Sequence, residues 1–200
     1  MDIVLATRNR KKAEELSRIL GDLDVRILTL DDFPSCPEVI EDRDTFEGNA
    51  IKKAAAIAQC TGTMAVADDS GLEVAVLNGA PGVLSARYAG EHADDAANLE
   101  KLLGEMRNVP DGQRGARFVC CIALAAPASG EEEVKTFFGF VEGTIGREPK
   151  GQRGFGYDPV FYPEGHARTF AEMGPEEKDA LSHRRRALEQ LKSYLKEFVR

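Results

Sequence analysis

The chain has 200 residues, and 26 Lys and Arg against 34 Asp and Glu give it a formal net charge of −8. So acidic a chain makes a poor general binder of duplex DNA, because that affinity comes mostly from Lys and Arg neutralising phosphates. Hydrophobic residues make up 42% of the chain, enough to form a core, which excludes intrinsic disorder. No apolar run approaches the roughly 18 residues of a membrane span. We therefore expect neither a nucleic-acid nor a membrane partner.

The chain has four cysteines, Cys36, Cys60, Cys120 and Cys121, and none of them has Cys-x-x-Cys spacing. Cys120 and Cys121 lie in an apolar run, where neighbouring strand residues point to opposite faces. Buried free thiols in a reducing cytoplasm fit this pattern better than a disulfide framework or a zinc site. The basic residues of the N-terminal segment follow its apolar residues, the reverse of a signal peptide. The predicted location is therefore cytoplasmic.

Hydrophobic spacing predicts strands alternating with helices. The predicted strands are residues 3–6, a short one around 25–27, 64–67, 118–125 and 136–142. The predicted helices are one ending at residue 20, one that Asp44 caps with Glu47 as its capping-box partner, one over residues 99–106 and one beginning near residue 182. Residues 127–133 join two strands as an antiparallel hairpin would, so we expect an α/β fold with a mixed sheet.

A strongly basic segment, residues 6–12 (ATRNRKK), lies between the first predicted strand and the first predicted helix. Backbone N–H groups and the helix dipole favour an anion at a helix N-terminus, whereas cations there are unfavourable unless an anion answers them. The spacing of a Walker A loop is absent. The segment indicates either a phosphate-binding loop or a solvated basic turn.

Two carboxylates, Asp68 and Asp69, follow the apolar run 64–67 and precede Ser70 and Gly71. A turn at this point would bring both carboxylates toward one hard cation, and Mg²⁺ typically takes one or two protein carboxylates with water and substrate phosphates. The acidic segment 38–42 could add a ligand. The alternative is an Asx-type turn with exposed acids.

A glycine-rich segment, residues 151–159 (GQRGFGYDP), offers close backbone approach and aromatic faces on which a base can stack. Its alternative is a connection whose aromatic residues belong to the core. Lys178 and the segment 182–186 (SHRRR), with four basic residues after Ser182, follow, again where a helix opens. Together these features indicate a nucleoside polyphosphate bound with Mg²⁺.

Seven motifs in order carry a resemblance to a known family: TxNxxK at residues 7–12, TFxxNAxxKA at 45–54, ADDSGL at 67–72, GAPGVLSARYAG at 79–90, GFGYDPVF at 154–161, AEM…EK at 171–178 and SHRRRAL at 182–188. The chain resembles the inosine triphosphate pyrophosphatase (Ham1-like) family nearly from end to end. Arg8 and Gly48 depart from the pattern where a small residue and a glutamate are frequent.

The resemblance implies one Ham1-like domain over residues 1–200: an elongated, two-lobed α/β fold with a mixed sheet flanked by helices and an active cleft between the lobes. It implies a homodimer that uses Mg²⁺ to hydrolyse ITP, dITP and XTP to the monophosphate and diphosphate, cleansing the nucleotide pool. Two alternatives stay open. One is a Maf-type pyrophosphatase for modified or pyrimidine nucleotides, and the other is a nucleotide-sensing module without turnover.

The same resemblance implies roles for individual residues. Asp69 is the expected general base, Glu41 and Asp69 are the expected Mg²⁺ ligands, and Asp68 is an outer-shell partner. The expected substrate-binding residues are Thr7, Arg8, Asn9, Arg10, Lys11, Lys12, Ser70, Phe155, Gly156, Tyr157, Asp158, Lys178, His183 and Arg184. Among these, His183 and Arg184 are expected to contact the purine base of the substrate. Arg184 is expected to donate a hydrogen bond to the 6-oxo group of that base.

Overall fold

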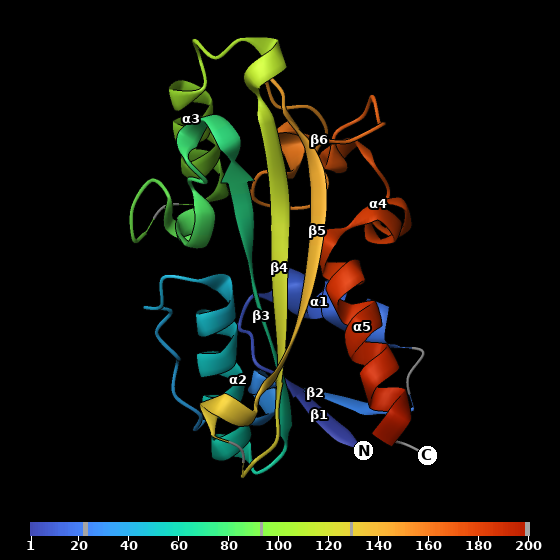
Figure 1. Ribbon diagram of the computed structural model, residues 1–200. Coiled ribbons are helices and arrows are strands. Elements are labelled where there is room, and N and C mark those ends of the chain that lie inside the picture. The colour runs from blue at the N-terminus through green and yellow to red at the C-terminus, as the bar shows by residue number, and fades with distance from the viewer. Residues whose placement is uncertain (22–23, 93, 129, 199–200) are drawn as a thin grey trace. The chain divides into compact units, whose positions relative to one another are not determined.

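The strands of the chain form a six-stranded sheet in the order β2-β1-β3-β4-β5-β6 (Figure 1). The structure is a computed structural model that describes residues 1–21, 24–92, 94–128 and 130–198. The strands are β1 (Asp2–Leu5), β2 (Arg26–Thr29), β3 (Met64–Val74), β4 (Gly115–Ala125), β5 (Lys135–Ile145) and β6 (Phe161–Pro163). β1 runs parallel to β2 and β3, whereas β5 and β6 are antiparallel. Neighbouring β4 and β5 also run in opposite directions (Figure 1), so the predicted hairpin and mixed sheet are confirmed.

The helices flank this sheet and include both predicted cationic helix starts. They are α1 (Arg10–Leu20), α2 (Phe46–Thr61), α3 (Asp95–Glu105), α4 (Pro175–Leu181) and α5 (His183–Phe198). The basic residues of both predicted segments therefore lie at helix N-termini, Arg8 just before α1 and the others within the first turns of α1 and α5, as the sequence predicts. No helix in the described part of the chain is both long and apolar enough to span a bilayer.

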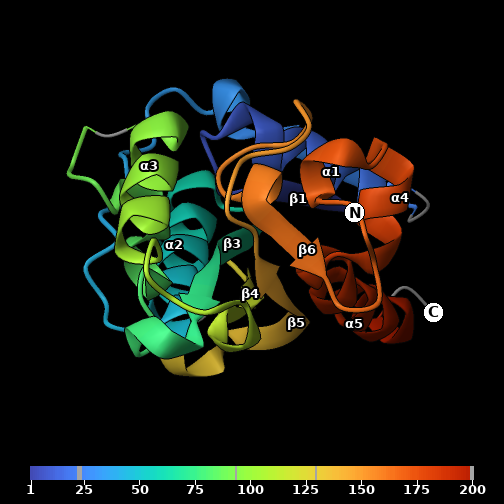
Figure 2. The ribbon, with the colours of Figure 1, turned by 90° about the horizontal axis from the view of Figure 1, so that it is seen from above.

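Contacts divide the chain into two compact units. The first comprises Met1–Asp69, Cys120–Gly139 and Arg184–Arg200, and the second comprises Ser70–Val119 and Phe140–His183. In the first unit α2 lies on one side of the strands, with α1 and α5 on the other (Figure 2). Its core joins Leu16 of α1 and Leu188 of α5 to Val66 of β3. In the second unit the ring of Phe118 lies 4.6 Å from that of Phe161 within a separate core.

The structure corrects two local predictions. β3 does not turn at Asp68 but continues to Val74, because Leu72 and Val74 are buried and keep an apolar segment in the sheet. Helix α2 is capped by Thr45 and not by Asp44: the Thr45 side chain accepts a hydrogen bond from the backbone N–H of Gly48 at 3.0 Å. Thr45 has the extended backbone of an N-cap residue, and its oxygen satisfies an otherwise unpaired helix N–H.

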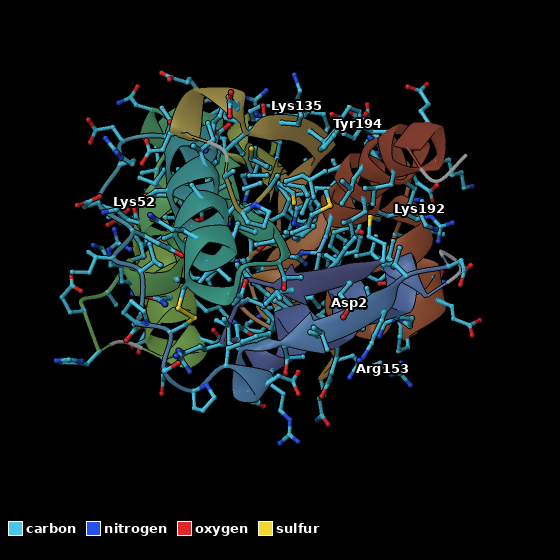
Figure 3. The ribbon with its side chains drawn as sticks, turned by 90° about the horizontal axis from the view of Figure 1, so that it is seen from below. Asp2, Lys52, Lys135, Arg153, Lys192 and Tyr194 are labelled. Atoms are coloured by element: carbon cyan, nitrogen blue, oxygen red, sulfur yellow. A yellow bond between two sulfur atoms is a disulfide. The ribbon has the colours of Figure 1, made fainter. Side chains whose placement is uncertain are left out.

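The cysteines correct a third prediction, since Cys36 and Cys60 form a disulfide (the yellow bond in Figure 3). The segment after β2 folds back along α2, which brings these residues to a Cα–Cα distance of 5.9 Å although 24 positions separate them. Spacing alone carries no signal of that approach. Cys120 and Cys121 are buried free thiols, as expected.

Candidate functional site

The predicted phosphate-binding segment is built around the N-terminus of α1. Asn9 caps the helix, because its side-chain oxygen accepts from the backbone N–H of Lys12 at 3.2 Å, and its own N–H donates to the Thr7 hydroxyl at 3.1 Å. The first turn of α1 contains no acidic residue. Arg8, Asn9, Arg10 and Lys11 are exposed. The helix dipole and these cations together favour an anion at this end.

Unlike these exposed residues, Lys12 extends its side chain into a buried cluster of paired positive and negative groups. Its ammonium lies 2.6 Å from the carboxylate of Asp68, which is fully buried. Nε of Arg184 donates to the same carboxylate at 2.9 Å, and Nη1 of Arg184 donates to Glu15 at 2.5 Å. The thiol of Cys120 also donates to Asp68, at 3.1 Å.

The cations of this cluster keep Asp68 ionised. Burial by itself favours the neutral acid, but Arg184 and Lys12 outweigh that effect and hold the pKa of Asp68 well below its usual range. Burial also opposes the charge on Lys12, yet Asp68 raises the pKa of that ammonium. Asp68 is therefore a fixed anion that orients Lys12 and Arg184, and its carboxylate is engaged by cations from α1 and α5.

Asp69 points to the other face of β3 and meets a different cation, Lys53 of α2. The Lys53 ammonium lies 2.5 Å from the Glu41 carboxylate and 3.7 Å from the Asp69 carboxylate. It also donates to the backbone carbonyl of Asp68 at 2.7 Å, which fixes it against β3. The two predicted metal ligands, distant in sequence, are thus brought to one ammonium group.

The surroundings of Asp69 suit a group that exchanges a proton near neutral pH. Burial raises its pKa to about 6, and the negative charges of Glu41 and Asp68 act in the same direction. Lys53 and Lys12 act against them. A general base works best when its pKa lies near the operating pH, so this carboxylate is a suitable proton acceptor.

Glu41 and Asp69 also have the chemistry that a divalent cation requires. Both offer hard carboxylate oxygens, and both already face one positive group, the Lys53 ammonium. Nowhere in the described residues do three or more His, Cys, Asp or Glu side chains converge. Mg²⁺ needs no such cage, because it typically binds one or two protein carboxylates and completes its shell with water and phosphate oxygens. The residues present therefore fit Mg²⁺ with a phosphorylated substrate.

In the second unit, a tight turn organises the glycine-rich segment. Gly154 has a φ of +74°, and a Cβ there would lie 2.0 Å from Oδ2 of Asp158, so a glycine is required. That oxygen accepts from the backbone N–H of Phe155 at 2.9 Å and from Lys178 at 2.6 Å. The Lys178 ammonium lies 4.9 Å from the centre of the Phe155 ring. Phe155, Asp158 and Lys178, all predicted contacts, thus form one cluster.

Other predicted substrate contacts of this unit have structural partners as well. Tyr157 is buried in the core, and its hydroxyl donates to the carbonyl of Ser85 at 2.8 Å. The backbone N–H of Gly156 donates to Asp95 at 3.0 Å. His183 is buried, and its ring stacks on Phe118 at 4.9 Å with an interplanar angle of 11°. Ser70 is half-buried in β3.

Residues 3–194 match the model of the Ham1 family. The chain belongs to the Ham1 family. A dITP/XTP pyrophosphatase from Desulforamulus reducens is 50% identical over 94% of this chain and 92% of its own length. One from Nocardia farcinica is 53% identical, with the same coverage of 94% and 92%. A Ham1 protein structure from Coxiella burnetii matches with a TM-score of 0.89 and 46% identity, covering 98% of this chain and 99% of its own.

Sequence reasoning missed two buried charged residues in the site of this Ham1 protein, Lys53 and Glu15, the carboxylate that accepts from Arg184. Lys53 is the one beside the candidate metal ligands. It lies on α2 four residues after Asn49, on the side of the helix that also carries the buried Ala50 and Ala54. Asn49 and Lys53 are both buried polar residues. Since lysine is rarely buried unless its charge is paired, a lysine at an apolar position of the predicted helix was the available signal.

Proposed function

We propose that this chain hydrolyses non-canonical purine nucleoside triphosphates, namely ITP, dITP and XTP, to the nucleoside monophosphate and diphosphate. The observation that carries the proposal is Asp69, a buried carboxylate whose pKa is raised to about 6 and which shares the Lys53 ammonium with Glu41. The relatives' names, dITP/XTP pyrophosphatase, support dITP and XTP among these substrates. A module that only binds nucleotide has no need of such a base, whereas hydrolysis does.

The chain's own residues account for the steps of that reaction. The N-terminus of α1 holds the phosphates. Lys12, whose ammonium lies 2.6 Å from the buried Asp68 carboxylate, stays a predicted phosphate contact. Asp69 accepts the proton of the water that attacks the α-phosphorus, and the diphosphate leaves. Glu41 and Asp69 would hold Mg²⁺, which neutralises phosphate charge and lowers the pKa of water. Lys53 fixes the two carboxylates relative to each other before the substrate arrives.

Recognition of the purine base is the second part of the proposal. Phe155 would stack on the purine without discriminating among bases, because every base has a π-face. The prediction that Arg184 reads the 6-oxo group stays a prediction, since Asp68 and Glu15 accept hydrogen bonds from each of its three nitrogens. The homodimer, the cytoplasmic location and the cleft between two lobes likewise stay predictions of the family resemblance.

Phosphate release tests the proposed function. The protein is incubated with ITP, XTP, dITP, ATP or UTP and Mg²⁺, with and without inorganic pyrophosphatase, and phosphate is measured with malachite green. We expect phosphate from ITP, dITP and XTP only when the pyrophosphatase is added, because the direct product is diphosphate. Preference for UTP would instead favour a Maf-type enzyme, and nucleotide binding without turnover would favour a sensing module. Asp69→Asn is the matched inactive control.

A further inference from the structure

The Cys36–Cys60 disulfide joins two parts of the chain that carry the candidate metal ligand and its lysine partner. Cys36 begins the Glu41 segment, residues 36–43 of the connection between β2 and α2, and lies five residues before Glu41. Cys60 lies in the last turn of α2, the helix that carries Lys53. The bond therefore fixes the start of the Glu41 segment to the far end of this helix.

A second contact links the disulfide to the predicted phosphate-binding segment. The guanidinium of Arg8 donates to the backbone carbonyl of Cys36 at 2.9 Å. Arg8 is one of the exposed cations before α1. The position of Cys36 thus affects the approach to the phosphate site as well as the Glu41 segment.

The other end of the Glu41 segment is held to α2 by non-covalent contacts alone. Glu41 binds Lys53, and the backbone N–H of Arg43 donates to the Asn49 side chain at 2.9 Å. Between the two attachments the chain is open to solvent, and Ile40 is 72% exposed. Breaking the disulfide would leave the segment attached to α2 at one end only.

The disulfide is also the accessible part of the cysteine chemistry. Cys60 is exposed, so a small dithiol can reach the bond from its side. Cys120 and Cys121 are buried, and burial raises the pKa of Cys121 to about 12. The thiolate is the reactive form, so these two thiols are inert at neutral pH.

We propose that Cys36–Cys60 is a thiol–disulfide exchange site that sets how firmly Glu41 is held, and thereby the divalent-cation affinity of the Glu41–Asp69 pair. The inference rests on the proposed function, which makes Glu41 a metal ligand. In the exchange a thiolate of a dithiol attacks one sulfur and the Cys36–Cys60 bond breaks. Two electrons and two protons pass from the dithiol to the cysteines, which become thiols, while the dithiol becomes a cyclic disulfide.

The expected effect follows from pre-organisation. Ordering one side chain on binding changes affinity by about two- to tenfold, so the reduced protein should bind Mn²⁺ more weakly by roughly that factor. Trypsin should cut after Arg43 faster in the reduced protein, because the preceding segment has lost one attachment. Turnover at saturating Mg²⁺ should change little, since no residue of the reacting cluster is altered.

The experiment compares the full chain in three forms: oxidised wild type, wild type reduced with dithiothreitol, and Cys60→Ser. Thiols counted after denaturation identify each form, with two expected in the oxidised protein and four in the reduced protein. Mn²⁺ alone is titrated by electron paramagnetic resonance, and tryptic fragments ending at Arg43 are followed in time. Dithiothreitol added to Cys60→Ser is the control for effects unrelated to the disulfide.

Weaker Mn²⁺ binding and faster cleavage in both the reduced protein and Cys60→Ser, with no further effect of dithiothreitol on the variant, would support the proposal. Equal cleavage in all forms, or Mn²⁺ binding that is equal or absent in all forms, would overturn it. Lack of ITP hydrolysis by the oxidised and reduced proteins alike would overturn the proposed function instead, and the two binding and cleavage results would still stand.

Discussion

Asp69→Asn should remove activity and at the same time stabilise the protein. The pKa of Asp69, about 6, lies roughly 2 above its ordinary value of 3.8, mainly because the carboxylate is buried. At about 1.4 kcal/mol for each pKa unit, ionised Asp69 costs the metal-free folded state about 3 kcal/mol at neutral pH. Asparagine resembles the neutral acid and avoids this cost. For a chain of this size the melting temperature should rise by roughly 6–12 °C.

The extra stability of Asp69→Asn over the wild type should increase as the pH rises. Between pH 3.8 and about 6 the folded protein binds more protons at Asp69 than the unfolded chain does. The contribution of Asp69 to stability is therefore fully present below 3.8 and is lost as the pH rises through about 6. The variant does not titrate at this position. The difference in free energy of unfolding should consequently be near zero at pH 3.8 and reach its maximum above pH 6.

Urea unfolding in EDTA, followed by circular dichroism from pH 4 to 8, measures this difference. Turnover should fall by about 10²- to 10⁴-fold, the usual loss on removing a general base. Asp68→Asn is the matched control with the opposite sign, because the pKa of Asp68 is held well below its usual range. Breaking that buried pair should destabilise the protein by about 3–5 kcal/mol. If Asp69→Asn had the same free energy of unfolding as the wild type at pH 7.5, the reasoning would be refuted.

Three further variants test separate parts of the site. Lys12→Ala should raise KM for the triphosphate more than it weakens binding of the monophosphate product in a calorimetric titration, and equal weakening would place Lys12 away from the outer phosphates. Lys53→Met should move the acid limb of the pH–rate profile to higher pH, because Lys53 lowers the pKa of Asp69. An acid limb at the wild-type pH would contradict that role. Arg184→Ala should reduce the ITP-over-ATP ratio of kcat/KM by about 10- to 100-fold, and an unchanged ratio would restrict Arg184 to its ion pairs.

The elements that could be predicted from the sequence are those with a strong and local hydrophobic pattern. The predicted strand 118–125 lies inside β4 (Gly115–Ala125), and the predicted helix ending at residue 20 is α1. The helix expected near residue 182 begins at His183. β6 has three residues and α4 has seven, too few to display a periodic pattern, and neither was predicted.

The contacts within the site depend on residues far apart in the chain and could not be predicted from spacing. Arg184 and Asp68 are 116 positions apart, and Cys36 and Cys60 are 24 apart. Local rules describe a side chain's own element, whereas these pairs form only after the elements pack. The sequence did indicate which residue types belong to the site, because cations at a helix start are unfavourable without an anion.

The alternation of side chains along β3 explains how adjacent carboxylates take different roles. A turn at residues 68–71 would have directed Asp68 and Asp69 toward one cation, and each would then have raised the pKa of the other. In a strand they point to opposite faces. Asp68 meets Lys12 and Arg184 and stays ionised, while Asp69 meets Lys53 and Glu41 with a pKa near 6. Because Lys12 and Arg184 engage its carboxylate, we expect Asp68 to act on a cation bound at Glu41 and Asp69 only indirectly, through Lys12 and through the Lys53 ammonium that its backbone carbonyl holds, and not as a direct ligand.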